Sequence, residues 1–104
     1  MRVHEMNLEN QRLKWLISRK INTSYLDDFL KDSDWRIRQT AVDRIGDQAK
    51  IKSMINDESI YVKIAAIVRL NDTETIKHII FNETDEWVKD VARSRYKTLM
   101  DIDI

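Results

Sequence analysis

Apolar positions along the chain follow a helical spacing, and the same spacing comes back in register. Three segments align when the chain is shifted by 25 residues and then by 26. The shared positions lie at offsets 0, 4, 7 and 8 within each segment, which places them on one side of an α-helix. The aligned sets are Ile37, Val62 and Val88; Ala41, Ala66 and Ala92; Arg44, Arg69 and Arg95; and Ile45, Leu70 and Tyr96. The pattern predicts one long helix in each segment.

A second, shorter amphipathic helix is predicted before each long helix. Its apolar positions are Leu26, Phe29 and Leu30; then Ile51, Met54 and Ile55; then Ile76, Ile79 and Ile80. A further shift of 24 residues extends the pattern back to a lone N-terminal helix. The helices are therefore predicted at about 9–21, 24–31, 35–45, 48–56, 60–70, 73–81 and 86–99.

Residues that start and end helices recur with the apolar positions. Ser and Asp side chains before a helix can accept hydrogen bonds from its free N–H groups. Gly46 and Asn71 follow two of the long helices, and these residue types favour the left-handed turn that ends many helices. The expected N-caps are Asp34, Ser59 and Asp85 for the long helices, and Asp47 and Asp72 for the short ones.

The segment DSDWRIRQTAVDRI, at residues 32–45, resembles a HEAT repeat. An Asp lies about six residues before an apolar–basic pair, and an Ala follows four residues after the apolar residue. The short period is also similar to that of the leucine-rich-repeat variant family. The resemblance covers about residues 8–100. It implies a right-handed superhelix of stacked helix pairs whose members mostly bind proteins, while a minority bind nucleic acid or cofactors.

We therefore expect an all-α chain that forms a right-handed α-α superhelix, or α-solenoid. It would contain about three and a half HEAT-like repeats in a single domain spanning residues 1–104. The expected divisions are a degenerate half-repeat at 8–23, helix pairs at 24–47, 48–72 and 73–100, and a tail at 101–104.

Composition narrows the classes of function. Eighteen basic and eighteen acidic side chains cancel, so the net charge provides no general attraction to nucleic acid or anionic lipid. The absence of cysteine excludes disulfides, cysteine-ligated zinc and iron–sulfur clusters. No apolar run reaches membrane-spanning length, and the N-terminal residues lack the apolar core of a signal peptide. These features favour a cytoplasmic protein that does not bind membranes.

Nothing in the sequence predicts catalysis, and we expect a non-enzymatic protein without cofactor or metal. His4 and His78 are the only histidines, and 74 residues separate them. Adjacent carboxylates such as Asp27 and Asp28 fall at predicted helix starts, where capping and solvation account for them. The single glycine leaves no phosphate-binding loop.

One row of residues lies on the side of the long helices opposite the predicted core. In a helical solenoid this side forms the concave binding face, and Trp is enriched at interface hot spots. The row predicts a non-catalytic protein–protein interaction module or scaffold, as a monomer or weak homo-oligomer with a protein partner of unknown identity. The expected contact residues are Trp15, Gln39, Ile64 and Asp90, with Arg44 and Arg69 at the edge.

A basic row near the ends of the long helices suggests an alternative function. Cations repeated at this spacing can follow the phosphate backbone of a nucleic acid. They can equally lay their aliphatic stems over the core and direct their charge to helix C-terminal carbonyls. The row consists of Lys20, Arg44, Arg69 and Arg95.

A second set of charges repeats with the helices. It can form either an exposed ionic strip for a partner or a structural ladder between adjacent repeats, and we favour the ladder. The basic members are Arg38, Lys63 and Lys89, and the acidic members are Asp32, Asp57 and Glu83.

The last long helix differs from its neighbours on one flank only. Glu86 and Arg93 stand where the preceding helix has Ile60 and Ile67. The opposite flank stays apolar, with Trp87 and Val91. We expect the polar flank to face water.

Overall fold

The computed structural model describes residues 26–101, and within this range the chain forms α-helices and connections without a strand. The all-α class predicted from the sequence is confirmed for this part of the chain. The helix expected at 9–21, together with Trp15 and Lys20, lies outside the described residues. None of the described helices combines the length and apolar content needed to cross a membrane.

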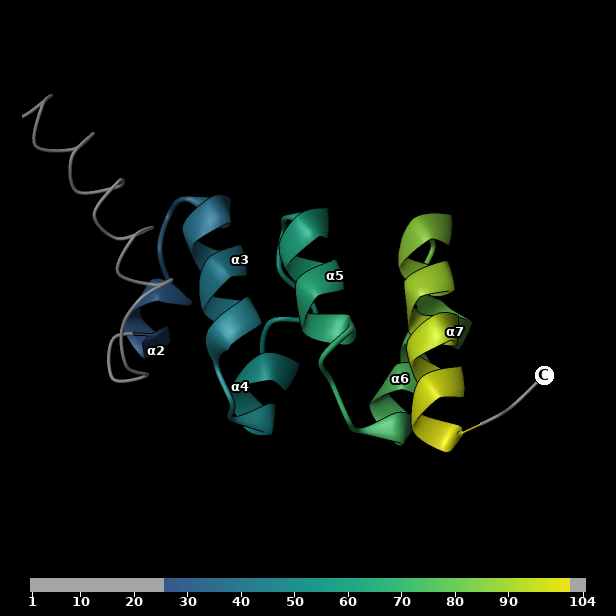
Figure 1. Ribbon diagram of the computed structural model, residues 1–104. Helices are drawn as coiled ribbons and strands as arrows, with labels where there is room; N and C mark the ends of the chain where they lie inside the picture. The colour runs from purple at the N-terminus through teal and green to yellow at the C-terminus, as the bar shows by residue number, and fades with distance from the viewer. Residues whose placement is uncertain (1–25, 102–104) are drawn as a thin grey trace, which may run out of the picture. The chain divides into compact units, whose positions relative to one another are not determined.

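Contacts group the chain into two units, residues 1–46 and 47–104. The described part of the first unit contains α2 (Leu26–Phe29) and α3 (Trp35–Arg44). The second unit contains α4 (Gln48–Lys52), α5 (Ile60–Ile67), α6 (Thr73–Asn82) and α7 (Glu86–Met100), as Figure 1 shows.

In the first unit, α2 packs against α3. The residues that the helical spacing predicts to face inward, Leu26 and Phe29 on α2 and Ile37 and Ala41 on α3, are buried. The carboxylate of Asp34 accepts the backbone N–H of Arg36 at 2.9 Å and so caps the start of α3.

In the second unit, α7 packs against both α5 and α6, and α4 packs against α5. Most of the apolar positions that the alignment predicts to face inward are buried, so this part of the predicted pattern is confirmed for them. Ile55, Ile80 and Tyr96 are only half-buried. The small residues of the core, Ala66 and Ala92, have no exposed surface. The large members of this core are Ile51, Val62, Ile67, Leu70, Ile76 and Val88.

Helix α4 is shorter than the pattern predicts. It ends at Lys52 rather than near residue 56. The N–H groups of Met54 and Ile55 donate to carbonyls three residues back, at 3.0 and 3.4 Å. This tighter hydrogen-bond pattern ends many short helices. The apolar spacing continues through the turn, which is why the sequence pattern overestimates the length of the helix.

Four of the five predicted N-caps make the expected hydrogen bonds: Asp34, Asp47, Asp72 and Asp85. Ser59 holds the N-cap position of α5 in an extended conformation, but its side chain makes no capping hydrogen bond. The predicted position of this N-cap is confirmed, whereas the prediction that the Ser59 side chain makes a capping hydrogen bond is wrong.

The left-handed turns expected at Gly46 and Asn71 are also wrong. Among the described residues only Asp101 has a positive φ, of 53°, at the end of α7. Helix α3 instead leaves through an extended Ile45, with φ −72° and ψ 143°. The backbone N–H of Asn71 donates to the side chain of Gln48 at 2.8 Å. A side chain from α4 thus accepts the hydrogen bond of the backbone N–H at this turn.

Replacing Gly46 with alanine is expected to raise the free energy of unfolding by about 0.4–1 kcal/mol. Gly46 does not use a positive φ, and an added Cβ would meet no atom within 4 Å. The methyl group therefore introduces no strain in the folded state, while it restricts the unfolded chain. Urea unfolding of Gly46→Ala beside the wild type measures the change. A loss of stability would contradict the backbone conformation assigned to Gly46.

Candidate functional site

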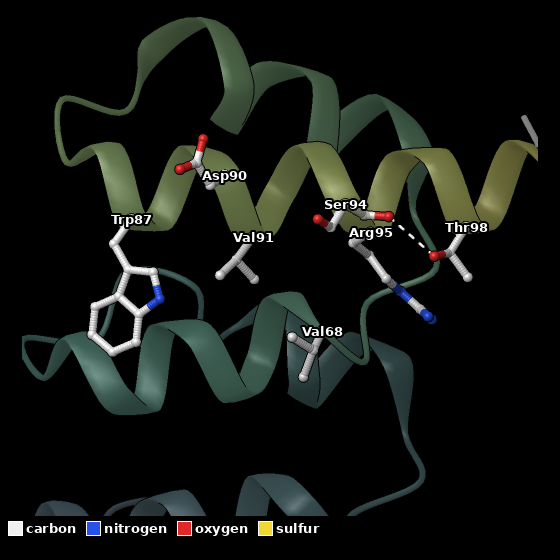
Figure 2. Close-up of a pocket in the computed structure, with 7 residues that line it drawn as sticks. All are labelled: Val68, Trp87, Asp90, Val91, Ser94, Arg95 and Thr98. Carbon is white, nitrogen blue, oxygen red and sulfur yellow. Dashed lines mark hydrogen bonds between the residues drawn. The ribbon is translucent and has the colours of Figure 1, made fainter. Parts of the chain in front are cut away.

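A groove of about 440 Å³ lies between the end of α5 and one face of α7, entirely within the second unit (Figure 2). The residues from α7 are spaced three and four apart, so they form a single stripe along the helix. The lining residues are Val68 from the end of α5 and Trp87, Asp90, Val91, Ser94, Arg95 and Thr98 from α7.

The apolar wall of the groove is formed by Val68, Trp87 and Val91. Figure 2 shows the indole of Trp87 and the side chain of Val91 directed toward α5. Tyr61 meets Trp87 edge-to-face, with ring centroids 6.0 Å apart and an interplanar angle of 81°. Trp87 is nevertheless 50% exposed and Val68 45%. The groove thus presents a positioned aromatic ring and an aliphatic side chain to solvent.

The other end of the groove is cationic. The Nε group of Arg95 donates to the carbonyl of Leu70 at 2.9 Å, and Nη2 donates to Oδ1 of Asn71 at 2.8 Å. The carbonyls that follow a helix lack intrahelical partners, so the guanidinium satisfies a group that would otherwise be unpaired. Arg95 thus makes the kind of contact that the structural interpretation of the basic row expects, and phosphate binding by the row stays a prediction. The Nη1 group of Arg95 makes no hydrogen bond within residues 26–101.

Asp90 marks the rim of the groove near Trp87. Its Oδ1 accepts Nη1 of Arg93, one turn along the same helix, at 2.7 Å. The carboxylate remains 70% exposed. Nearer the cationic end, the hydroxyl of Thr98 donates to the carbonyl of Ser94 at 3.0 Å (Figure 2). The groove therefore has an acidic rim at one end and a guanidinium at the other.

The predicted contact row is distributed over several elements. Gln39 is half-buried on α3 and Arg44 is exposed at the end of that helix, both in the first unit. In the second unit, Ile64 is half-buried on α5 and Arg69 is half-buried after it. Asp90 is the member of the row that lines the groove. A contact role for every member of the row, Asp90 included, stays a prediction.

Five groove residues were not among the expected contacts: Val68, Trp87, Val91, Ser94 and Thr98. The signal for two of them was present in the sequence, because the flank of the last helix that carries Trp87 and Val91 stays apolar. The opposite flank carries Glu86 and Arg93, whose side chains are 75% and 45% exposed, as expected for a flank that faces water. The sequence could not show that Val68, from a different helix, completes the groove.

The predicted charge ladder is confirmed for one pair between helix pairs. Nζ of Lys63, on α5, lies 3.1 Å from Oε2 of Glu83, between α6 and α7. Arg38 also makes a local contact, donating Nη1 to the carbonyl of Asp32 at 2.8 Å. Lys89 pairs with Glu86 of its own helix at 3.8 Å.

The acidic members of the ladder share a local role that the sequence did not reveal. In each case a carboxylate accepts the backbone N–H of the N-cap residue two positions later. The bonds are Asp32 to Asp34 at 2.9 Å, Asp57 to Ser59 at 2.8 Å, and Glu83 to Asp85 at 3.2 Å. The N–H of Asp85 and, less strongly, Lys63 lower the pKa of Glu83 below its usual value, against a partial desolvation that raises it.

A second depression of about 400 Å³ lies where α4 meets the α5–α6 connection. Gln48 donates to the carbonyl of Arg69 at 3.0 Å and accepts the N–H of Asn71. Lys52 pairs with Asp72 at 3.0 Å. These polar groups bond to one another and so join α4 to the α5–α6 connection. We therefore interpret the depression as structural.

Asp72 is expected to make stability depend on pH. Lys52, then the hydroxyl and N–H of Thr75, lower the pKa of Asp72 to about 2 from an ordinary value of 3.8. Since the folded pKa lies below the unfolded one, the stabilisation is complete above about pH 4 and is lost as the pH falls toward 2. Urea midpoints measured across this window should vary less in Asp72→Asn than in the wild type. If the urea midpoint depended on pH equally in Asp72→Asn and in the wild type, the lowered pKa assigned to Asp72 would be contradicted.

Within residues 26–101, no group of three or more His, Cys, Asp or Glu side chains is placed to hold a metal ion. Comparisons with known protein families, curated proteins and solved structures give no match for this chain, so its own residues carry the functional proposal.

Proposed function

We propose that this chain is a non-catalytic protein-interaction module and that the α5–α7 groove is its contact surface. The observation that carries the proposal is the half-exposed Trp87, which Tyr61 holds edge-on at the mouth of an apolar groove. Positioned aromatic side chains lose little conformational freedom on binding and contribute much of the energy at protein interfaces.

The charges at the groove favour a protein partner. The exposed carboxylate of Asp90 and the guanidinium of Arg95 give opposite charge to the two ends of one stripe. A nucleic-acid surface would need cations along its whole length. Arg95, a member of the basic row, is already bonded to the carbonyl of Leu70. Both observations support protein binding over phosphate binding.

We further propose that the helix pairs are HEAT-like repeats of a right-handed α-solenoid. Two observations support this. The equivalent positions Ile37, Val62 and Val88 are each almost fully buried. In addition, the three long helices begin with the same acid-to-N-cap hydrogen bond. A repeated local geometry is what a repeated structural unit requires.

Affinity capture from a lysate of the source organism tests the proposed function. The full chain serves as the bait, and the lysate is treated with nuclease. The protein retained by the wild type is compared with that retained by Val68→Asp. This variant puts a charge on a residue that is already 45% exposed, so folding should be retained. We expect the wild type to retain a protein in stoichiometric amount, and Val68→Asp to retain at least tenfold less, which corresponds to about 1.4 kcal/mol.

The matched control is Phe81→Asp, on α6, where the side chain is 82% exposed and does not line the groove. This variant should capture the same protein as the wild type. Equal loss in both variants would contradict the groove as the contact surface. In a parallel capture without nuclease, nucleic acid that is released by moderate salt would instead favour the basic row.

A further inference from the structure

We infer that the segment that occupies the α5–α7 groove belongs to another protein and places a cationic side chain, Lys or Arg, beside the exposed indole of Trp87 and the carboxylate of Asp90. The inference rests on the proposed function and names the chemistry of the partner at the same groove. Three features carry it: an exposed aromatic surface, an available carboxylate oxygen beside that surface, and nearby charges that leave this end of the groove anionic.

Trp87 provides the surface on which a cation can lie. It is 50% exposed, although Tyr61 packs against it edge-to-face with ring centroids 6.0 Å apart. The electron-rich face of an indole attracts ammonium and guanidinium groups more strongly than the ring of Tyr or Phe does. Figure 2 shows Val91 next to Trp87 along α7. The aliphatic stem of a Lys or Arg can therefore pack on Val91 while its charged end reaches the indole.

Asp90 supplies the negative charge beside this surface. It follows Trp87 by one helical turn and also lines the groove. Arg93 donates to its Oδ1 from the flank of α7 opposite Trp87, and Oδ2 makes no hydrogen bond within the described residues. An aliphatic side chain packed here would remove water from the carboxylate without replacing its hydrogen bonds, and an acidic one would be repelled. A Lys or Arg can instead donate a charge-assisted hydrogen bond to Oδ2.

The other charges near Trp87 do not cancel this preference. The start of a helix favours anions, and Trp87 lies in the first turn of α7. Here the carboxylate of Asp85 already accepts the N–H groups of Trp87 and Val88, at 2.9 and 3.1 Å, so its charge opposes the helix dipole. Arg95 lies about 7.5 Å further along the helix axis than Asp90, and its Nε and Nη2 groups are bonded beyond the end of α5. The Trp87 end of the groove therefore stays anionic.

Selection from a random peptide library displayed on phage tests the inference, with the full chain as the target. We expect the wild type to enrich peptides that carry Lys or Arg at one position among apolar residues, about threefold or more over the starting library. Asp90→Lys reverses the charge at the groove and should enrich Asp or Glu at that position instead. Because the carboxylate of Asp90 is 70% exposed, this substitution should leave the fold unchanged, which circular dichroism checks.

Glu86→Lys is the matched control. It makes the same change of charge on the same helix, and its carboxylate is 75% exposed, but Glu86 does not line the groove. This variant should enrich the same basic peptides as the wild type. An enriched peptide is then synthesised with Arg and with citrulline, the uncharged analogue of Arg. Calorimetric titration should show a dissociation constant about threefold or more higher for the citrulline peptide with the wild type, and a smaller difference with Asp90→Asn.

Enriched peptides without a basic position would overturn the inference, and so would a basic preference that Asp90→Lys leaves unchanged or that Glu86→Lys also reverses. Selection of no peptide would overturn it as well. In each of these cases, capture of a protein that Val68→Asp loses would leave the proposed function standing. A wild-type dimer in sedimentation equilibrium that Val68→Asp dissociates would assign the groove to a second copy of the chain, and would likewise overturn the inference.

Discussion

Replacing Ile76 with alanine is expected to destabilise the protein by about 2–5 kcal/mol. Ile76 lies on α6, which packs against α7, and its side chain has no exposed surface. The truncation removes apolar contact and leaves a cavity that the surrounding helices can fill only in part. Since small domains are stable by about 5–15 kcal/mol, a loss of this size is a large fraction of the total.

The control for this prediction is on the same helix. Phe81 is a larger apolar residue, but it is 82% exposed, so Phe81→Ala should change the free energy of unfolding by less than about 0.5 kcal/mol. Urea unfolding followed by circular dichroism measures both variants. If Phe81→Ala were as damaging as Ile76→Ala, the face of α6 that packs inward would have been assigned incorrectly.

Replacing Ala66 with leucine is expected to destabilise the protein by about 1–3 kcal/mol. Ala66 has no exposed surface and lies on α5, which packs against both α4 and α7. A longer side chain must either move these helices apart or adopt an unfavourable rotamer. The small residue is therefore required by the close approach of neighbouring helices.

Ala49, on α4, provides the matched exchange at an exposed position. Ala49→Leu should change stability by less than about 0.5 kcal/mol, because the added carbons extend into water. Thermal unfolding of the two leucine variants compares them directly. Similar melting temperatures would show that the helices around Ala66 leave room for a larger side chain, although Ala66 is fully buried.

Much of the fold could be predicted because its signals are local. The starts of α3, α5 and α7 follow Asp34, Ser59 and Asp85 as expected. A cap needs only one side chain and the N–H groups of the next turn. The helix ends were predicted less well, as Gly46 shows. Its residue type allows a left-handed turn, but the chain leaves α3 in an extended conformation there.

Less of the candidate site could be predicted. Asp90 was expected at the contact surface, and it lines the groove. Val68 was missed because helical periodicity assigns it to a flank, without saying what lies beside that flank. The sequence allows two roles for Arg95, phosphate binding and helix capping. Its contact with Leu70 connects residues 25 positions apart, and no local pattern specifies which carbonyl the guanidinium reaches.

By itself, the sequence determined the helical class of the described residues, the order of the helices along the chain, most of the N-caps and most of the buried positions. These properties depend on the spacing of residues within a few turns. Only the tertiary structure decided that Val68 and α7 enclose a groove, that Tyr61 orients Trp87, and that Arg95 is bonded at the end of α5. Those contacts join side chains from separate helices, and their geometry follows from how closely the buried alanines and aliphatic residues allow the helices to pack.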